Sequence, residues 1–315
     1  MQKIICYIQK INYLHIIKKI HIFAVQNGSM PAKKEKNTIH APRVRASNRK
    51  RVAKSVTSVT SMEKRIILGS SVIILILMVS LHISGCFNDL KASKLNRDYI
   101  NFPEFGIHLP TSYSIHGFDV SVHQGLLNWG LLEKAESGNV KLDFVFIKAT
   151  EGRTKVDRYY KHNWQQAKNH GFIRGAYHYL LPNKSGKDQA KLFLKTVDLE
   201  EGDFVPVCDI EVTAGVDKEM IEQCVQDWLD TVEETVGKKP IIYTSKKFYE
   251  SYLSDSFSDY PLWIAHYYVP GLDLEDNNKW HFWQHSDKAR IKGISKRLDF
   301  NVFNGSMDEL NLFRI

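Results

Sequence analysis

Short apolar runs alternate with amphipathic segments from about residue 116 to the end of the chain. Apolar runs bounded by turn-forming residues are typical of buried strands, and apolar positions recurring every three or four residues are typical of helices. The runs predict eight strands, at residues 117–121, 144–150, 171–179, 206–212, 240–244, 262–266, 280–285 and 298–302. The amphipathic segments predict helices at residues 129–135, 159–169, 187–197, 217–236 and 246–253.

The order of these elements indicates the fold class. Repeated strand–helix units imply a parallel α/β sheet, and eight such strands can close into a TIM-like barrel whose active site lies at the carboxyl ends of the strands. The last three strands leave no room for full helices between them. We therefore expect an incomplete, irregular barrel.

Two carboxylates in the fourth predicted strand are the first candidates for chemistry. Asp209 and Glu211 stand two residues apart, so in a strand they would share one side, about 6.6 Å apart at about 3.3 Å per residue. An isolated pair of this kind is more often a solvated strand end or a structural ion pair, but its neighbours here are apolar. Like charges beside an apolar wall do not both ionise easily, so one carboxyl should stay protonated near neutral pH. Glu211, nearer the strand's end, is the candidate acid.

Further polar and aromatic residues are predicted to lie on the same rim. The polar candidates at the ends of other strands are Asp119, Glu151, Gln284 and Asp299. The aromatic candidates interleaved with them are Tyr177, Tyr179, Tyr243, Trp263, Tyr267 and Trp283. Rings beside carboxylates suit a carbohydrate, although any one of these aromatic residues taken singly is more often part of a core.

The N-terminal region differs in composition from the rest of the chain. Residues 1–65 hold fifteen Lys and Arg and two acids, a net charge of +13, so the whole-chain +8 leaves −5 for residues 66–315. A basic, polar segment of this kind is expected to be a disordered tail. Residues 1–29 show no regular period, and Met30 and Met62 are alternative first residues. The tail would suit nucleic acid, but the segment after it points to a membrane instead.

Residues 66–83 are uncharged and mostly aliphatic, enough to cross about 27 Å of hydrocarbon as a helix. Lys64 and Arg65 precede them, and positive residues stay on the cytoplasmic side. We therefore expect the tail on the cytoplasmic side of the inner membrane and the following domain on the other side, facing the periplasm or the cell exterior. The end of the segment, residues 81–86, also resembles a lipoprotein signal, with Cys86 as the lipidated residue. Both alternatives, a transmembrane helix at 66–85 or a lipid on Cys86, give one topology, with residues 86–113 as a tether and 114–315 as the folded domain.

Cysteine and histidine give no metal signal. Cys208 and Cys224 are the two cysteines of the predicted domain, and both are expected to pack as small apolar groups. No Cys/His cluster suggests zinc, so we expect neither a metal nor a cofactor.

Eight short motifs in order resemble one known family. They are Gly117-Phe-Asp-Val-Ser-Val-His-Gln-Gly125, Phe146-Ile-Lys-Ala-Thr-Glu-Gly152, Gly175-Ala-Tyr-His-Tyr179, Asp209-Ile-Glu211, Tyr243-Thr-Ser245, Leu262-Trp-Ile-Ala-His-Tyr267, Phe282-Trp-Gln-His285 and Asp299-Phe-Asn301. Across residues 115–315 the chain resembles the family 25 glycoside hydrolases, the Chalaropsis-type lysozymes. The resemblance implies a (β/α)5(β)3 barrel and an N-acetylmuramidase that cleaves the β-1,4 bond between N-acetylmuramic acid and N-acetylglucosamine in peptidoglycan.

The resemblance also implies roles for single residues. Glu211 matches the general acid, Asp209 the carboxylate that assists it, Asp119 and Asp299 two further acids of the rim, and Tyr177 a sugar contact. Attack by the substrate's acetamido group and direct attack by water both stay open. The alternative function is a non-catalytic, membrane-anchored protein that binds envelope glycan through Tyr177, Trp263 and Trp283. We expect a monomer whose partners are peptidoglycan strands and the membrane, and no nucleic acid.

Overall fold

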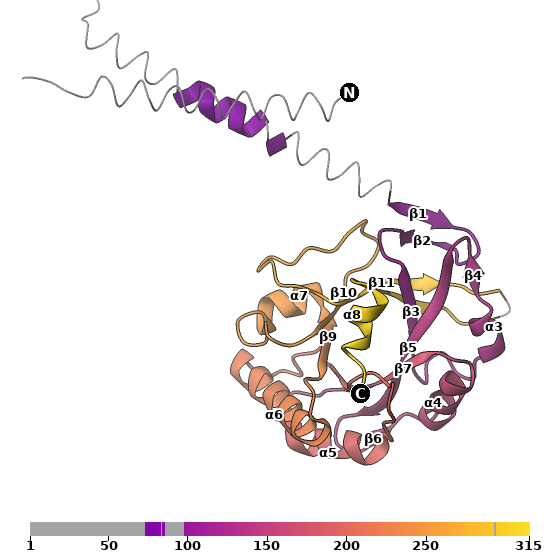
Figure 1. Ribbon diagram of the computed structural model, residues 1–315. Coiled ribbons are helices and arrows are strands. Elements are labelled where there is room, and N and C mark those ends of the chain that lie inside the picture. The colour runs from indigo at the N-terminus through magenta and orange to yellow at the C-terminus, as the bar shows by residue number, and fades with distance from the viewer. Residues whose placement is uncertain (1–72, 83, 86–97, 293) are drawn as a thin grey trace, which may run out of the picture. The chain divides into compact units, whose positions relative to one another are not determined.

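The computed structural model describes residues 73–82, 84–85, 98–292 and 294–315 (Figure 1). The predictions for the basic tail, for residues 66–72 and for Cys86 lie outside the described residues. Residues 73–82 are helical. In the described part of the chain, no helix has both the length and the apolar composition needed to cross a membrane.

Eight strands form a closed barrel. They are β3 (Ile115–Val120), β5 (Val140–Glu151), β7 (Ile173–Tyr179), β8 (Val207–Asp209), β9 (Ile241–Ser245), β10 (Leu262–Ala265), β11 (Phe282–Ala289) and β12 (Leu298–Phe303). Their order around the barrel is β3-β12-β11-β10-β9-β8-β7-β5, and β5 pairs with β3 to close the ring. All neighbours are parallel except at β12, which is antiparallel to both β11 and β3. The predicted eight-stranded, irregular barrel is confirmed.

Five helical segments cover the barrel where the sequence predicted helices, and the short α8 was not predicted. They are α3 (Trp129–Glu133), α4 (Tyr160–Asn169), α5 (Gly186–Thr196), α6 (Lys218–Val236), and α7 (Lys246–Phe248) continuing into the π-helix η1 (Tyr249–Leu253). The longest, α6, begins at Asp217, whose side chain accepts a hydrogen bond from the Met220 amide, and ends at Gly237 in the left-handed conformation. Short elements complete the fold: β4 (Glu136–Ser137), β6 (Lys155–Val156) and α8 (Met307–Asn311).

The barrel separates two apolar cores. The interior is packed by aromatic rings, among them Phe144, Phe146 and Phe282, with Trp263 stacked on Phe146 at a centroid distance of 4.3 Å. A larger core lies between the strands and the outer elements and includes Trp228, Cys208 and Cys224. Both cysteines are buried free thiols, as predicted. A filled interior leaves room for a site only at an end of the barrel.

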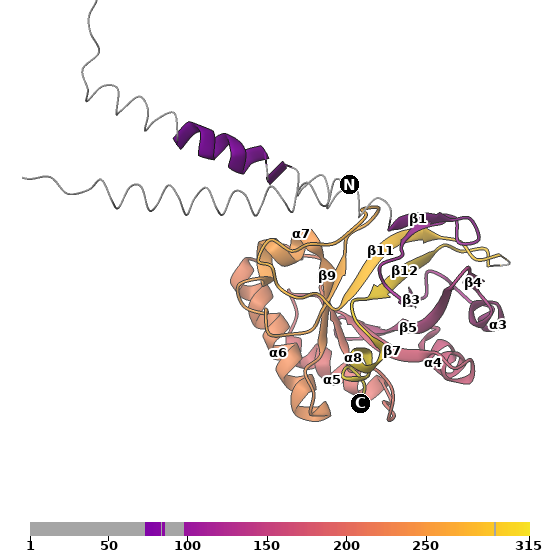
Figure 2. The ribbon, with the colours of Figure 1, turned by 45° about the horizontal axis from the view of Figure 1, so that its top comes forward.

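Residues 98–113, predicted as part of a tether, are folded instead. They contain an antiparallel hairpin of β1 (Tyr99–Phe102) and β2 (Ile107–Pro110). Phe105 at its turn is buried, its ring lies 5.1 Å from that of Phe300 on β12, and its carbonyl accepts a hydrogen bond from the Arg290 amide at 2.9 Å. The hairpin thus packs against β11 and β12, where the barrel has no long helix (Figure 2).

The carboxylate strand is shorter than predicted. β8 ends at Asp209, whereas the prediction ran to residue 212. The Ile210 amide still bonds to the Tyr243 carbonyl at 3.0 Å, but Ala214 and Gly215 both have positive φ and turn the chain towards α6. The apolar run continues past the strand because Ile210 is buried in the outer core.

The hairpin contact gives a test of this fold. Phe105→Ala should lower the free energy of unfolding by about 3 kcal/mol, because it empties a buried ring site. Ile100→Ala on the same hairpin should change it by less than about 0.5 kcal/mol, because Ile100 is exposed. Urea denaturation of the two variants measures both values, and equal small effects would show that the hairpin is not part of the cooperative fold.

Candidate active site

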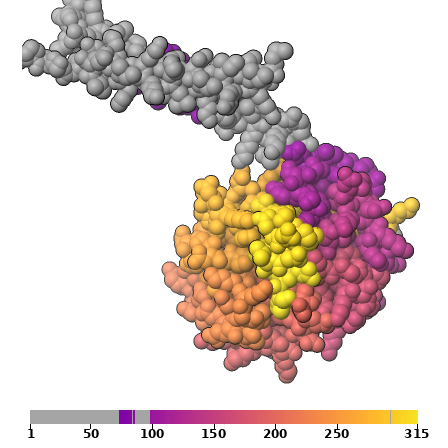
Figure 3. All heavy atoms as spheres, viewed as in Figure 1, coloured from indigo at the N-terminus to yellow at the C-terminus, as the bar shows by residue number. Residues whose placement is uncertain are grey.

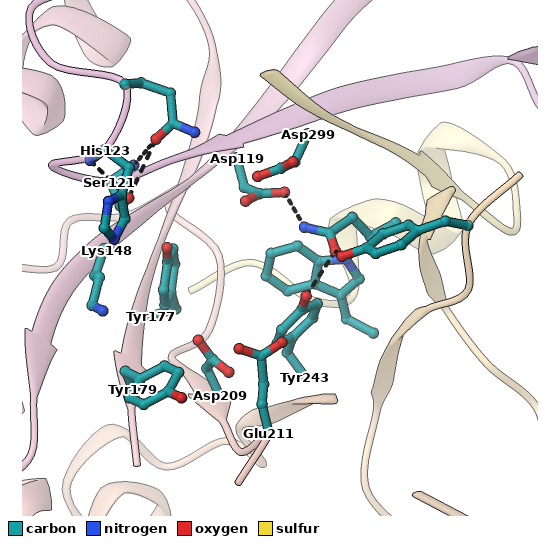
Figure 4. Close-up of a pocket in the computed structure, with 14 residues that line it drawn as sticks. Asp119, Ser121, His123, Lys148, Tyr177, Tyr179, Asp209, Glu211, Tyr243 and Asp299 are labelled. Atoms are coloured by element: carbon teal, nitrogen blue, oxygen red, sulfur yellow. Dashed lines mark hydrogen bonds between the residues drawn. The ribbon is translucent and has the colours of Figure 1, made fainter. Parts of the chain in front are cut away.

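A pocket with a cavity volume of about 330 Å³ opens at the carboxyl ends of the parallel strands (Figure 4). This is the end of the barrel where the sequence placed the site. The residues that line it come from all eight strands or the loops that follow them: Asp119, Ser121, His123, Gln124, Lys148, Tyr177, Tyr179, Asp209, Glu211, Tyr243, Trp263, Tyr267, Gln284 and Asp299.

Asp209 and Glu211 both reach the pocket, but in different environments. Asp209 at the end of β8 is only 4% exposed, and its Oδ1 atom has no hydrogen-bond partner in the described part of the protein. Burial, followed by the charge of Glu211, raises the pKa of Asp209 well above its usual value. Glu211 stands two residues beyond, with its side chain accessible from solvent. Desolvation by the surrounding protein atoms raises the pKa of Glu211 as well, and a hydrogen bond with Tyr243 offsets part of the rise.

Asp119 is held by a chain of hydrogen bonds across the barrel mouth. Its Oδ2 atom accepts from Gln284 Nε2 at 2.7 Å and from Asn301 Nδ2 at 2.8 Å. The amide oxygens of these two residues accept in turn: Gln284 from the hydroxyls of Tyr243 and Tyr267, and Asn301 from Trp263 Nε1. Because every amide hydrogen bond has a fixed direction, this chain orients the Asp119 carboxylate rigidly.

Asp299 forms a second acidic pair with Asp119. The two residues are direct partners in the register of β12 and β3. Burial, followed by the charge of Asp119, raises the pKa of Asp299 to about 9. The pKa of Asp119 is raised by burial to about 6, against the two amide hydrogen bonds that lower it. Near neutral pH the pair therefore holds one proton between its two carboxyls.

Glu151 and Trp283 do not line the pocket, although both were predicted to bind substrate. The Glu151 carboxylate is taken up by ion pairs to Lys148 at 2.7 Å and Lys155 at 3.0 Å. Although burial opposes it, these bonds lower the pKa of Glu151. Trp283 is fully buried in the outer core, and its Nε1 donates to the His266 carbonyl at 2.8 Å. The remaining ten predicted residues all line the pocket.

Four lining residues were absent from the predicted site: Ser121, His123, Gln124 and Lys148. Lys148 carries the clearest signal, since a lysine inside an otherwise apolar strand must have a buried partner. Its Nζ contacts Glu151 and lies 4.6 Å from the centre of the Tyr179 ring. From there its charge opposes the rise in the pKa of both Asp209 and Glu211.

No set of three or more His, Cys, Asp or Glu side chains in the described residues could hold a metal ion. Carboxyl groups of unequal exposure and raised pKa, set among tyrosine hydroxyls and a tryptophan at the mouth of an α/β barrel, are the arrangement of a barrel glycoside hydrolase.

Comparison with known proteins identifies the family. The model of "Glycosyl hydrolases family 25" matches residues 118–294, more than half of the chain, and the chain belongs to this family. YegX of Escherichia coli (strain K12) is 45% identical over 222 residues, 69% of this chain and 81% of that protein. Lysozyme M1 of Streptomyces globisporus is 30% identical over 210 residues, 62% of this chain and 70% of that one. A solved family 25 glycosyl hydrolase from Bacillus anthracis has a TM-score of 0.61 and 31% identity, covering 66% of this chain and 97% of its own.

The raised pKa of Asp299 predicts that removing its carboxyl stabilises the protein more at high pH than at low pH. A carboxyl whose pKa is raised by folding does not change the free energy of unfolding at a pH where it is protonated in both the folded and the unfolded state. As pH rises from about 4 towards 9, its ionisation favours the unfolded state, and the fold loses stability. Asp299→Asn removes that ionisation. The variant should therefore gain more than about 1 kcal/mol of unfolding free energy relative to the wild type between pH 5 and pH 9. Denaturation at the two pH values checks this, and a pH-independent difference would contradict it.

Proposed function

We propose that the protein is a muramidase that cleaves the β-1,4 bond between N-acetylmuramic acid and N-acetylglucosamine in bacterial peptidoglycan. Family membership supports hydrolysis of a glycan, and relatives named as lysozymes support peptidoglycan as that glycan. The observation that carries the proposal is the unequal pair Asp209 and Glu211, with one carboxyl buried and the other accessible in the same pocket.

Glu211 is suited to the role of general acid. Its raised pKa favours the protonated form that a general acid needs, and its accessible side chain can reach the oxygen of a glycosidic bond lying across the pocket. Protonation of that oxygen lets the bond break and leaves positive charge on the neighbouring sugar ring. Asp119, held by Gln284 and Asn301, is placed to stabilise that charge.

Asp209 is suited to orient the substrate's acetamido group. Its unpartnered Oδ1 atom needs a hydrogen-bond donor, and the N–H of an acetamido group on the sugar beside the broken bond supplies one. Accepting that bond would aim the acetamido oxygen at the anomeric carbon. This favours attack by the substrate's own group over direct attack by water, and it implies retention of configuration.

A glycan-binding protein without activity is the alternative. It would use the rings and hydroxyls of Tyr177, Tyr179, Tyr243 and Trp263 in the same pocket. Such a protein gains nothing from a buried carboxyl that lacks a partner, because an unsatisfied polar group costs free energy. The acidic residues therefore favour the enzyme.

Glu211→Gln tests the acid. The variant should cleave purified peptidoglycan at least about a hundredfold more slowly, because glutamine cannot donate a proton to the leaving oxygen. Mass spectrometry of released muropeptides, with N-acetylmuramic acid at the reducing end, measures the rate. Glu201→Gln, on an exposed residue outside the pocket, is the matched control and should keep full activity. Binding of sacculi by the wild type without any release would establish the glycan-binding alternative.

The stereochemistry of the first product tests the role of Asp209. We expect the new reducing end to appear as the β-anomer in early NMR spectra, since attack by the acetamido group retains configuration. Asp209→Asn should slow turnover by about a hundredfold or more, because the neutral amide no longer stabilises the positive charge that develops on the attacking group. An α-anomer as first product would establish direct attack by water.

A further inference from the structure

The end of β11 and the loop that joins it to β12 are strongly basic. Residues 288–297 contain five cations and no acid, and all five side chains are exposed: Lys288, Arg290, Lys292, Lys296 and Arg297. We call this segment the basic hairpin. Within residues 98–315, 25 Lys and Arg stand against 32 Asp and Glu, a net charge of −7, so the basic hairpin opposes the charge of the domain that carries it.

These cations have no acidic partners in the described part of the protein. Nine other Lys and Arg side chains of the domain form ion pairs: Lys141, Lys148, Arg153, Lys155, Lys168, Arg174, Lys218, Lys246 and Lys279. None of the five cations of the basic hairpin takes part in one. Unpaired like charges held together repel one another, so their concentration in one short segment favours an anionic partner.

The basic hairpin is held to the fold by its apolar positions. Ala289 and Ile291 are buried, while the alternate positions 288, 290 and 292 are exposed, so one face packs inwards and the other carries the charge. The Arg290 amide bonds to the Phe105 carbonyl of the β1–β2 hairpin at 2.9 Å. In Figures 1 and 3 the segment stands out from the edge of the domain.

One end of the basic hairpin adjoins the pocket. Lys288 Nζ lies 4.0 Å from the centre of the exposed Tyr268 ring, whose centroid is 5.8 Å from that of Tyr267, a residue of the pocket wall. Tyr268 has a φ of 60°, which a non-glycine residue rarely adopts and which sets the direction of its ring. A ligand that leaves the pocket over Tyr267 and Tyr268 would therefore meet Lys288 first.

We propose that the basic hairpin binds the free carboxylates of the peptide stems of peptidoglycan while the glycan lies in the pocket. This inference rests on the proposed function. Peptide stems branch from the muramic acid residues of the strand and carry carboxylates, so a glycan held in the pocket brings anionic groups to the domain surface. A cationic segment on an otherwise acidic domain then attracts the substrate and sets its direction.

Anionic phospholipid is the other partner that a cationic surface could fit. Proteins that lie on a lipid surface usually insert apolar side chains between the headgroups beside their cations. In the basic hairpin the large apolar residue Ile291 is buried against the domain, and Ile294 is partly buried. Among its described residues, the exposed positions are the five cations and Ser295, and a surface without exposed apolar side chains fits a hydrated peptide better than a bilayer.

The test compares two substrates. The variant Arg290→Gln, Lys292→Gln, Lys296→Gln, Arg297→Gln is assayed on intact sacculi and on glycan strands freed of their peptides by an amidase. On intact sacculi, the concentration at half-maximal rate should rise about tenfold at low salt, as expected when four exposed charge contacts are lost. On peptide-free strands it should match the wild type. Salt should weaken the wild type on sacculi and have little effect on the variant.

A matched variant removes the same charge elsewhere. Lys161→Gln, Lys187→Gln, Lys191→Gln, Lys195→Gln neutralises four exposed lysines of α4 and α5, and it should behave like the wild type on both substrates. Lys288 is left in place in the first variant because it contacts Tyr268.

Each other outcome overturns the inference. Equal loss on both substrates would mean that the substitutions disturb the pocket, and no loss on either would mean that the cations bind no part of the substrate. Loss of binding to phosphatidylglycerol vesicles, with both activities unchanged, would assign the basic hairpin to lipid. If the wild type cleaves neither substrate, the proposed function itself fails.

Discussion

The antiparallel pairing of β12 with β3 is the constraint on which the site depends. It closes the barrel between residues about 180 positions apart and sets Asp299 directly opposite Asp119. The neighbouring pairing of β11 with β12 sets Gln284 opposite Asn301, the two amides that hold Asp119. A shift of one residue in either register would turn these side chains to the other face of the sheet. Barrel closure and assembly of the acidic centre are therefore one event.

Burying several carboxyls at this end of the barrel disfavours their ionised forms, and this affects the chemistry of the site. Asp119, Asp209 and Asp299 all lie where water is scarce, and each has a raised pKa with burial as the largest cause. Lys148 supplies one compensating charge, but its ammonium group is shared with Glu151. Protons therefore stay in the site near neutral pH. A site that must donate a proton to a leaving oxygen needs this condition.

Much of the barrel could be predicted from the sequence because buried strands and amphipathic helices have different periods. The pocket was harder, because it depends on which side of a strand each residue faces. Trp283 and Gln284 were both assigned to the pocket, yet adjacent strand residues point to opposite faces, and only Gln284 reaches it. Glu151 does not line the pocket, and its carboxylate is bound instead by Lys148 and Lys155. Pairings of this kind join distant residues and leave no local pattern.

Two features that the sequence did not predict, the β1–β2 hairpin and the basic hairpin, both lie beside strands β10 to β12. Strands β10 to β12 follow one another without long helices, so their outer faces need another cover. The β1–β2 hairpin provides it through Phe105, from a segment whose composition suggested only a tether. The same contact anchors Arg290 and so fixes the start of the basic hairpin. No long helix among the described residues covers this part of the barrel. The loop between β11 and β12 can therefore carry charged residues beside the pocket without any change in the strands that hold the carboxyls.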